Sequence, residues 1–447
     1  LAAPAIRLFV TRKLRTAGVE AGRISERFGQ PTEARPKGPL IWFHAVSVGE
    51  VNQLGPLIDG LLRERPDASI SISAGTDTGL QLAQRLFSQH HVFRMPLDFS
   101  WAMENTIRHL RPHLILLTET EIWPNLIRSA EKHGVPLALI NARLSDHSAK
   151  GYAWIQPLMA ATLNRIALIT AQSESDAHRL QSIGARCPMQ VTGSIKFDNV
   201  IVDPANADTA KFRRLLQIDS DQMVFIAGST QDPEESFAID CYQQLVDRFS
   251  QLRLLLVPRH PERFQEVAKL LDESGIEWTR RSQIADPDNP ADRTRTETVQ
   301  PVVLVDSIGE LSSIWGLADI AFVGGSMGKR GGQNMIEPAA FGAAVSFGPK
   351  TSNFRGVVRL LLDHDAATVV RDAESMRSFV RECCENPAQS TAMGQRARET
   401  VLTQQGAVGK TINTLLPLLD DQRSRNTVNH RQDPSVEDDL NNDQRAA

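Results

Sequence analysis

The segment from Phe43 to Ile58, "FHAVSVGEVNQLGPLI", contains a carboxylate whose position suits two roles. Glu50 follows a strand-like apolar run, precedes a helix-like one and lies three residues after Ser47. Ser-x-x-Glu before an apolar run is a capping box, in which Ser47 accepts a hydrogen bond from the amide of Glu50 and Glu50 reaches back to Ser47. The same carboxylate could instead take a proton from a substrate as a general base. On the spacing alone, the capping role is favoured, because caps are far commoner than catalytic bases.

Other candidate side chains of the first half also follow apolar runs. Glu119 and Glu121 come directly after "LILLT". Two neighbouring carboxylates can raise each other's pKa and divide acid and base roles, although a Glu also favours the positive start of a helix. Lys196 follows "MQVTG" and either binds an anionic ligand as a point charge or is an ordinary surface lysine.

In the second half, "VPRHPERF" places Arg259 after a predicted strand, and Ile308, Gly309 and Glu310 stand at a predicted helix start, where free backbone amides bind phosphate. The strongest pattern is "FVGGSMGKRGGQNMIEPAAFG", with glycines around Lys329 and Arg330. It leads into a helix bearing Asn334 and Glu337. A glycine-rich loop lets the backbone approach a ligand closely, and a Glu in the first helical turn can accept from ribose hydroxyls. The stretch therefore indicates a nucleotide-sugar site.

The elements that must position these residues alternate between short apolar runs and longer amphipathic segments. The predicted strands of the first half are "LIWFHAV", "SISISA", "LILLT", "LALI", "IALIT" and "MQVTG", and those of the second are "MVFIAG", "LRLLLV", "PVVLV", "DIAFVGG" and "AAVSFG". This alternation predicts an α/β protein with parallel sheets covered by helices on both faces. We expect two Rossmann-like domains whose sheets face a central cleft.

The domain boundaries follow from polar interruptions of the pattern. We expect a basic, amphipathic, membrane-associating segment at 1–27, which carries six Lys or Arg residues, unless this is a solvated surface helix. The first Rossmann-like domain is predicted at 28–198. A linker at 199–221 and a second Rossmann-like domain at 222–420 follow, and the last domain is assigned the nucleotide sugar. The polar tail at 421–447 is expected to be disordered.

Composition excludes several functions. The 447 residues carry a net charge of -4 and 6% aromatic residues, which argues against a nucleic-acid partner. The four cysteines have no zinc-site spacing, and the Asp-x-Asp sequences lie in polar loops, so no metal is expected. No G-x-G-x-x-G follows the first strand, which argues against a dinucleotide enzyme, and no cofactor is expected.

Seven motifs occur in one fixed order: "FHAVSVGE", "TETEIWPNL", "NARLS", "VTGSIKFD", "VPRHPERF", "FVGGSMGKRGGQNMIEPAA" and "GP" at Gly348–Pro349. Over about residues 20 to 420 the chain resembles the lipid A Kdo (3-deoxy-D-manno-octulosonic acid) transferases of Gram-negative bacteria. The resemblance implies the GT-B glycosyltransferase fold, with CMP-Kdo as the donor, bound by the second domain. It implies the lipid A precursor lipid IVA as the acceptor, held by the first domain at 28–198. It also implies a place at the cytoplasmic face of the inner membrane, either peripheral or through an anchor that this chain does not contain.

The resemblance also implies residue roles. Glu50 becomes the general base, and Glu119 and Lys196 stabilise the transition state. The CMP contacts carried over are Pro258, Arg259, Ile308, Gly309, Glu310, Asn334, Met335, Ile336 and Glu337. Two positions depart from the family pattern, because Gln231 and Gln333 stand where the family commonly has histidine. A Gln keeps hydrogen bonding but cannot titrate, so neither is assigned to catalysis.

Two rival functions remain open from the sequence. One is another GT-B enzyme, such as a UDP-sugar transferase or epimerase, which shares the fold but not the donor. The other is a two-lobed binding protein without catalysis, which the basic amino end and Glu50 disfavour.

Overall fold

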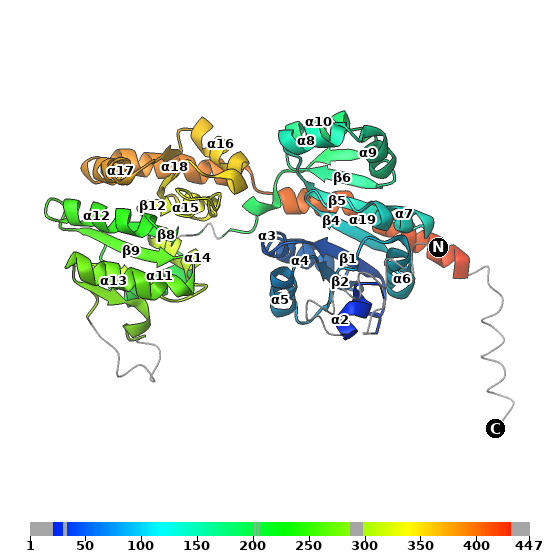
Figure 1. Cartoon of the computed structure of the whole chain (residues 1–447), viewed down its shortest axis with the longest axis horizontal. Coiled ribbons are helices and arrows are strands. Elements are labelled where there is room, and N and C mark those ends of the chain that lie inside the picture. Colours follow the sequence, from blue (N-terminus) through cyan, green and yellow to red (C-terminus); the bar gives the residue numbers. More distant parts are fainter. Residues whose placement is uncertain (1–20, 30–33, 201–202, 204, 287–297, 431–447) are drawn as a thin grey trace, which may run out of the picture. The chain divides into compact units, whose positions relative to one another are not determined.

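The structure, a computed structural model, describes residues 21–29, 34–200, 203, 205–286 and 298–430. Its contacts divide the chain into two units. Unit 1 runs to Asn199 and resumes at Gln405, and unit 2 comprises Val200–Gln404. Each unit is a parallel sheet with helices on both faces (Figure 1).

Unit 1 is built on a seven-stranded sheet of order β3-β2-β1-β4-β5-β6-β7. Its strands are β1 (Leu40–Ala45), β2 (Ser69–Ala74), β3 (His91–Arg94), β4 (Leu114–Thr118), β5 (Leu137–Ala142), β6 (Leu168–Ala171) and β7 (Met189–Val191). Its helices are α2 (Ala21–Glu26), α3 (Val48–Val51), α4 (Leu54–Glu64), α5 (Asp77–Leu86), α6 (Ser100–Leu110), α7 (Pro124–Lys132), α8 (Asp146–Ala153), α9 (Gln156–Leu163), α10 (Glu174–Ser182), the 3₁₀ turn η1 (Ile195–Phe197) and α19 (Ala407–His430).

β1 is an interior strand of the unit 1 sheet and is buried on both faces, which is why its sequence is almost continuously apolar. Leu40 and Trp42 pack into one core cluster, and Ile41 and Phe43 pack into the other. β1 pairs in parallel with β2 on one side and with β4 on the other. The strand order reverses between β1 and β4, and ligands of open α/β sheets bind beyond the carboxyl ends of the strands at such a point.

Unit 2 has a seven-stranded parallel sheet of order β10-β11-β9-β8-β12-β13-β14. Its strands are β8 (Met223–Thr230), β9 (Leu252–Pro258), β10 (Trp278–Arg280), β11 (Val302–Leu304), β12 (Ile320–Val323), β13 (Ala344–Phe347) and β14 (Ala367–Val369). Its α-helices are α11 (Ala207–Leu215), α12 (Glu234–Val246), α13 (Phe264–Ser274), α14 (Leu311–Ile314), α15 (Ile336–Phe341), α16 (Arg355–Asp363), α17 (Ala373–Glu385) and α18 (Pro387–Thr403), and its 3₁₀ turns are η2 (Pro261–Arg263), η3 (Arg281–Gln283), η5 (Trp315–Leu317) and η6 (Ser352–Phe354).

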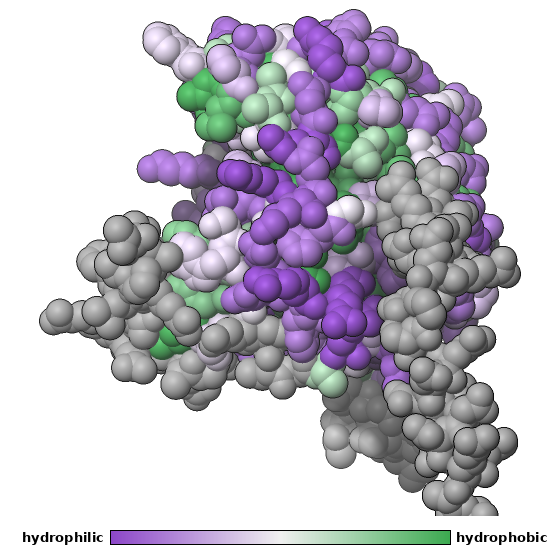
Figure 2. Space-filling view, turned by 90° about the vertical axis from the view of Figure 1, so that its right-hand side faces the viewer, coloured by the Kyte–Doolittle hydropathy of each residue, from purple (hydrophilic) through white to green (hydrophobic). Residues whose placement is uncertain are grey.

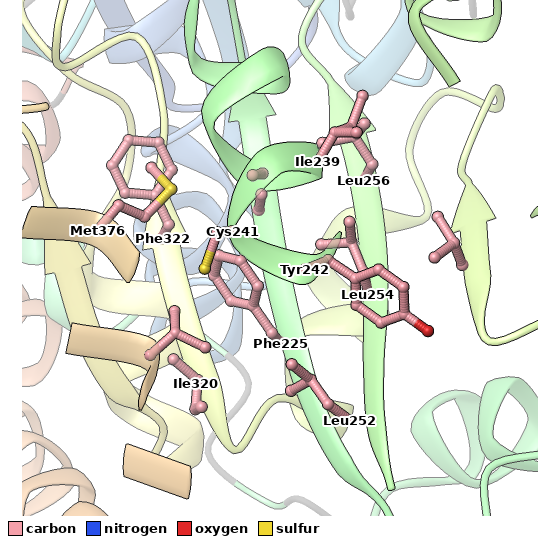
Figure 3. Packing of buried hydrophobic residues seen from close by; sticks show 14 of the residues in the cluster. Phe225, Ile239, Cys241, Tyr242, Leu252, Leu254, Leu256, Ile320, Phe322 and Met376 are labelled. Carbon is pink, nitrogen blue, oxygen red and sulfur yellow. The ribbon is translucent and has the colours of Figure 1, made fainter. Parts of the chain in front are cut away.

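Large apolar side chains fill the space between the central strands of unit 2 and α12 and α17. Phe225 of β8 and Phe322 of β12 lie in one cluster with Tyr242 of α12 and Met376 of α17 (Figure 3). The burial holds β8 and β12 side by side. These are the strands between which the order of this sheet reverses.

The predicted α/β class and parallel sheets are confirmed, but three strands were missed. β3, β10 and β14 each lie at an edge of a sheet. They are short, and most of their residues are only half-buried. An edge strand needs no continuous apolar run, so the sequence gives it little signal.

The boundaries between the two units differ from the predicted domain boundaries. The proposed linker, 199–221, contains α11, which contacts α14 and η5 of unit 2. The second domain was predicted to run to residue 420, but α19 belongs to unit 1, where Ile412, Leu415 and Leu419 complete a core cluster. α19 also continues past Asp421 to His430, where a disordered tail was expected. Residues 431–447 and most of the predicted membrane-associating segment lie outside the described residues.

Candidate active site

The three residues predicted to act in catalysis come together in unit 1. Glu50 lies on α3 after β1, Glu119 follows β4, and Lys196 lies on η1 after β7. Thr118 at the end of β4 hydrogen-bonds Glu50, and Lys196 pairs with Glu119. These contacts place a chain of charged groups at the carboxyl ends of the strands where the sheet order reverses.

Glu50 is a half-buried carboxylate that does cap α3. Ser47 accepts a hydrogen bond from the Glu50 amide at 3.4 Å, as the capping box predicts. The return contacts differ, because Glu50 accepts from the Ser47 hydroxyl at 2.8 Å and from the Val46 amide at 2.9 Å rather than from the Ser47 amide. The Thr118 hydroxyl adds a third donor at 2.7 Å.

Glu121 has the most perturbed carboxyl group of this site. Burial and the negative charge of Glu50, with a smaller effect of Glu119, raise its pKa to about 7, although a hydrogen bond from Trp123 Nε1 at 2.9 Å opposes the shift. The carboxyl group of Glu121 is therefore partly protonated at neutral pH. Sequence reasoning named the pair Glu119 and Glu121, but burial and Glu50 outweigh Glu119 in this shift.

Glu119 has the opposite environment. Burial alone would raise its pKa, but Lys196 at 3.0 Å and Arg143 at 3.5 Å outweigh burial, so the net pKa is lowered. Its backbone has a φ of 52°, in the left-handed region that few non-glycine residues adopt. The two glutamates of "TETE" therefore have pKa values shifted in opposite directions. Cations keep Glu119 ionised, whereas Glu121 titrates near neutral pH.

Two amide side chains, missed by sequence reasoning, connect these groups. Gln53 Nε2 donates to Glu119 Oε1 at 3.4 Å, and Asn141 Nδ2 donates to Gln53 Oε1 at 3.0 Å. Asn141 Oδ1 then accepts from the amide of Ile195, next to Lys196. Their signal was the position of Asn141 in "NARLS" at the end of β5. The network holds Glu119 and Lys196 in a defined geometry.

The residues predicted to contact CMP all lie in unit 2, at the carboxyl ends of its strands. Arg259 follows β9 and is exposed, and its positive charge acts on Glu337. Burial raises the pKa of Glu337, and hydrogen bonds from Asn334, at 2.8 Å, and Ser312 together with Arg259 oppose the shift. Pro258, Met335 and Ile336 are buried, and the Ile336 amide donates to Asn334 Oδ1 at 3.1 Å.

The loop after β11 differs from a plain helix start. Ile308 is 75% exposed and Gly309 has a φ of 90°. Glu310 precedes the four-residue helix α14 and pairs with Arg281 at 3.0 Å. The charge of Glu310 is therefore partly neutralised by Arg281, which leaves the exposed backbone around Gly309 open to a ligand.

The glycine-rich loop after β12 is held by a buried carboxylate that sequence reasoning missed. Glu234, 1% exposed, accepts from the amides of Gly325 and Gln231 through Oε2 and from those of Ser326 and Met327 through Oε1, at 2.7–2.9 Å. The expectation that this loop offers its backbone to a ligand is therefore wrong for residues 325–327, because Glu234 already occupies those amides.

The other glycines of the loop permit close packing. Gly331 has a φ of 84°, and a Cβ there would lie 2.3 Å from Ser352 Oγ. Gln333 packs against Gly325, and the buried Nε2 of Gln231 has no hydrogen-bond partner within the described residues.

In the part of the chain that the structure describes, no cluster of three metal-ligating side chains occurs. No helix among these residues is long and apolar enough to span a bilayer.

Two doubly wound units with polar sites at the strand ends form a GT-B type fold. UDP-GlcNAc 2-epimerase from Neisseria meningitidis bound to UDP-GlcNAc shares this fold, with a TM-score of 0.58 and 13% identity over 85% of this chain and 100% of that one. Residues 22–199 match the family described as 3-Deoxy-D-manno-octulosonic-acid transferase (kdotransferase).

The chain belongs to this family of glycosyltransferases. It is 34% identical over 403 residues to 3-deoxy-D-manno-octulosonic acid transferase of Haemophilus influenzae, covering 89% of this chain and 92% of that protein. It is 32% identical over 426 residues to the Bordetella pertussis protein of the same name, covering 92% and 96%. The family resemblance derived from the motifs is confirmed.

Proposed function

We propose that the protein transfers Kdo from CMP-Kdo to lipid IVA in a single inverting displacement, in lipopolysaccharide biosynthesis. Family membership supports Kdo transfer, and one geometric observation supports the mechanism. This observation is the carboxylate Glu50, held at the strand ends of unit 1 beside a carboxyl group whose pKa is raised to about 7.

Glu50 is the general base of this proposal. A carboxylate has about four acceptor positions, and three donors occupy positions on Glu50: Ser47 on Oε1, and Val46 and Thr118 on Oε2. One position on Oε1 therefore remains for a primary hydroxyl of the glucosamine disaccharide. That hydroxyl loses its proton to Glu50 as its oxygen attacks the anomeric carbon of Kdo. The attack and the departure of CMP occur on opposite sides, so the configuration inverts.

Glu119 and Lys196 stabilise the transition state. The ion pair with Glu119 holds the ammonium group of Lys196, and the Gln53–Asn141 network holds Glu119. The Lys196 side chain is 21% exposed. A cation in this position stabilises negative charge that develops during the displacement.

CMP is bound by unit 2 and leaves with an additional negative charge. Arg259 supplies a positive charge, the backbone around Gly309 supplies donors, and Glu337 accepts from the ribose hydroxyls. These groups can stabilise the leaving phosphate in the way that a metal ion does elsewhere, so transfer is proposed to be independent of metal.

The acceptor is a lipid, and the surface of unit 1 offers apolar residues for it. Trp154, Ile155 and Leu158, at the junction of α8 and α9, are 91%, 45% and 57% exposed. No Asp or Glu occurs from His147 to Ser173. Figure 2 shows hydrophobic surface in the upper part of the face on which unit 1 is seen, among hydrophilic residues. Exposed Trp beside aliphatic side chains suits the interface of an anionic membrane, which we propose is the cytoplasmic face of the inner membrane.

Mass spectrometry of lipid IVA after incubation with the protein and CMP-Kdo tests this proposal. Addition of one or more Kdo residues is the expected result. Turnover of a UDP-sugar in place of CMP-Kdo would support the rival GT-B enzyme, and tight CMP-Kdo binding without any transfer or hydrolysis would support a binding protein.

A further inference from the structure

Unit 2 contains a cationic pocket that none of the roles above uses. It has a volume of about 440 Å³ and is lined by Gly328, Lys329, Gly331, Pro349, Lys350, Thr351, Ser352 and Arg355. Three of these residues are cations and none is acidic. Within the described part of the chain, Lys329, Lys350 and Arg355 form no ion pair. An open pocket that gathers cations without a counter-charge is suited to an anion.

Two loops that build this pocket are tied together by hydrogen bonds. The Asn353 amide donates to the Gly331 carbonyl at 2.9 Å, and Asn353 Nδ2 donates to the Arg330 carbonyl at 2.8 Å. The Lys350 amide donates to the Ser326 carbonyl at 2.8 Å, and Ser326 is itself held through its amide by buried Glu234. The pocket is therefore a built feature of the fold rather than a chance gathering of flexible side chains.

The position of the pocket relates it to the nucleotide residues. Gly331 in its wall is three residues from Asn334, so the two Cα atoms are at most about 11 Å apart. The sugar of a nucleoside monophosphate sugar lies at a distance of this order from the nucleoside. The hydroxyl groups of Thr351 and Ser352 make no hydrogen bond within the described residues, and they suit the hydroxyl groups of a sugar.

We propose that this pocket binds the sugar-acid part of the donor, with Lys350 and Arg355, assisted by Lys329, holding the Kdo carboxylate. The inference rests on the proposed function, because CMP-Kdo carries this carboxylate and free CMP does not. It makes the pocket the feature that distinguishes a sugar acid from a neutral sugar, since an uncharged sugar would leave three cations without a partner.

The test measures the binding of CMP-Kdo, CMP and lipid IVA to the unaltered protein and to Lys350→Ala/Arg355→Ala by calorimetry. The matched control is Arg359→Ala, which removes an 84% exposed cation of the same helix that does not line the pocket. We expect the double variant to bind CMP-Kdo at least tenfold more weakly while its affinity for CMP changes less than twofold. The control should match the unaltered protein in both measurements.

Three results would overturn this assignment. They are an unaltered protein that binds CMP-Kdo no more tightly than CMP, a double variant with unchanged CMP-Kdo affinity, and a double variant that loses affinity only for lipid IVA. The last would assign the pocket to an acceptor phosphate. Turnover of the unaltered protein is measured separately. If the unaltered protein transfers no Kdo, but its preference for CMP-Kdo over CMP is lost in the double variant, the proposed transfer is refuted and the subsite stands. Equal melting temperatures establish that the variants are folded.

Discussion

Replacing Glu50 by Gln separates the capping role from the catalytic one. The carboxylate accepts three hydrogen bonds, from Ser47, Val46 and Thr118. A Gln oxygen in place of Oε2 can still accept from Val46 and Thr118, and the hydroxyl of Ser47 can rotate to accept from the new NH₂ group. Only the charge assistance of these bonds is lost, so we expect a stability cost of about 1 kcal/mol. For a unit of this size, that lowers the melting temperature by about 2–4 °C.

The catalytic role predicts a much larger effect on turnover than on stability. The Gln side chain cannot accept the proton of the acceptor hydroxyl, and general-base catalysis is worth about 10²- to 10⁴-fold in rate. The corresponding increase in the barrier is about 2.7–5.4 kcal/mol, several times the expected loss of stability. CMP affinity should be unchanged, because the residues proposed to bind CMP lie in unit 2.

The assay measures kcat with CMP-Kdo and lipid IVA, CMP affinity and melting temperature for Glu50→Gln. Glu64→Gln, the same chemical change at an exposed position of α4, serves as the control. Near-normal turnover of a stable Glu50→Gln protein would refute the base and leave only the cap. A large fall in melting temperature, together with lost CMP binding, would contradict the structural part of the reasoning.

Four further predictions concern other groups. Glu121→Gln should raise the melting temperature more at pH 8 than at pH 5. Because the pKa of Glu121 is raised to about 7, the unaltered protein loses stability as pH rises from about 4.5 to about 7. An equal gain at both pH values would contradict this. Glu234→Gln should cost roughly 2–4 kcal/mol in urea denaturation, since its NH₂ group would face two backbone amides; no change in stability would refute its structural role. Transfer should persist in EDTA, and a loss that magnesium restores would refute metal independence. Deleting residues 1–18 should weaken binding to anionic vesicles, more at low than at high salt, whereas unchanged binding would favour a surface helix.

The sequence predicted those parts of the fold and site that depend on local patterns. The apolar central strands predicted both sheets, and "SVGE" predicted the cap of α3, because the groups involved are neighbours in the chain. The edge strands β3, β10 and β14 were missed because their residues are only partly buried, and burial produces the apolar signal. The placement of α19 was missed because its apolar side chains do not indicate which core they complete.

The electrostatic division of the site depends on distances that sequence does not contain. Glu119 and Glu121 are equivalent as a spacing, but a left-handed residue at Glu119 sends one carboxylate to Lys196 and leaves the other near Glu50. The pKa values of the two carboxyl groups therefore move in opposite directions. Family motifs identified Glu119, whereas only the folded structure identifies Glu121 as a group that titrates near neutral pH.

The glycine-rich loop was recognised from its sequence, but the physical reason given for its glycines was incomplete. Glycines after a strand suggested amides free for a ligand, but the amides of 325–327 bind Glu234, which is 91 residues from Gly325 in sequence. At Gly331 the absence of a Cβ instead permits the loop after β13 to pack closely, with Ser352 and Asn353 against it. The glycines thus position the two loops that bear Lys329 and Lys350. A substitution at Gly331 should therefore affect recognition of the sugar acid before it affects binding of the nucleotide.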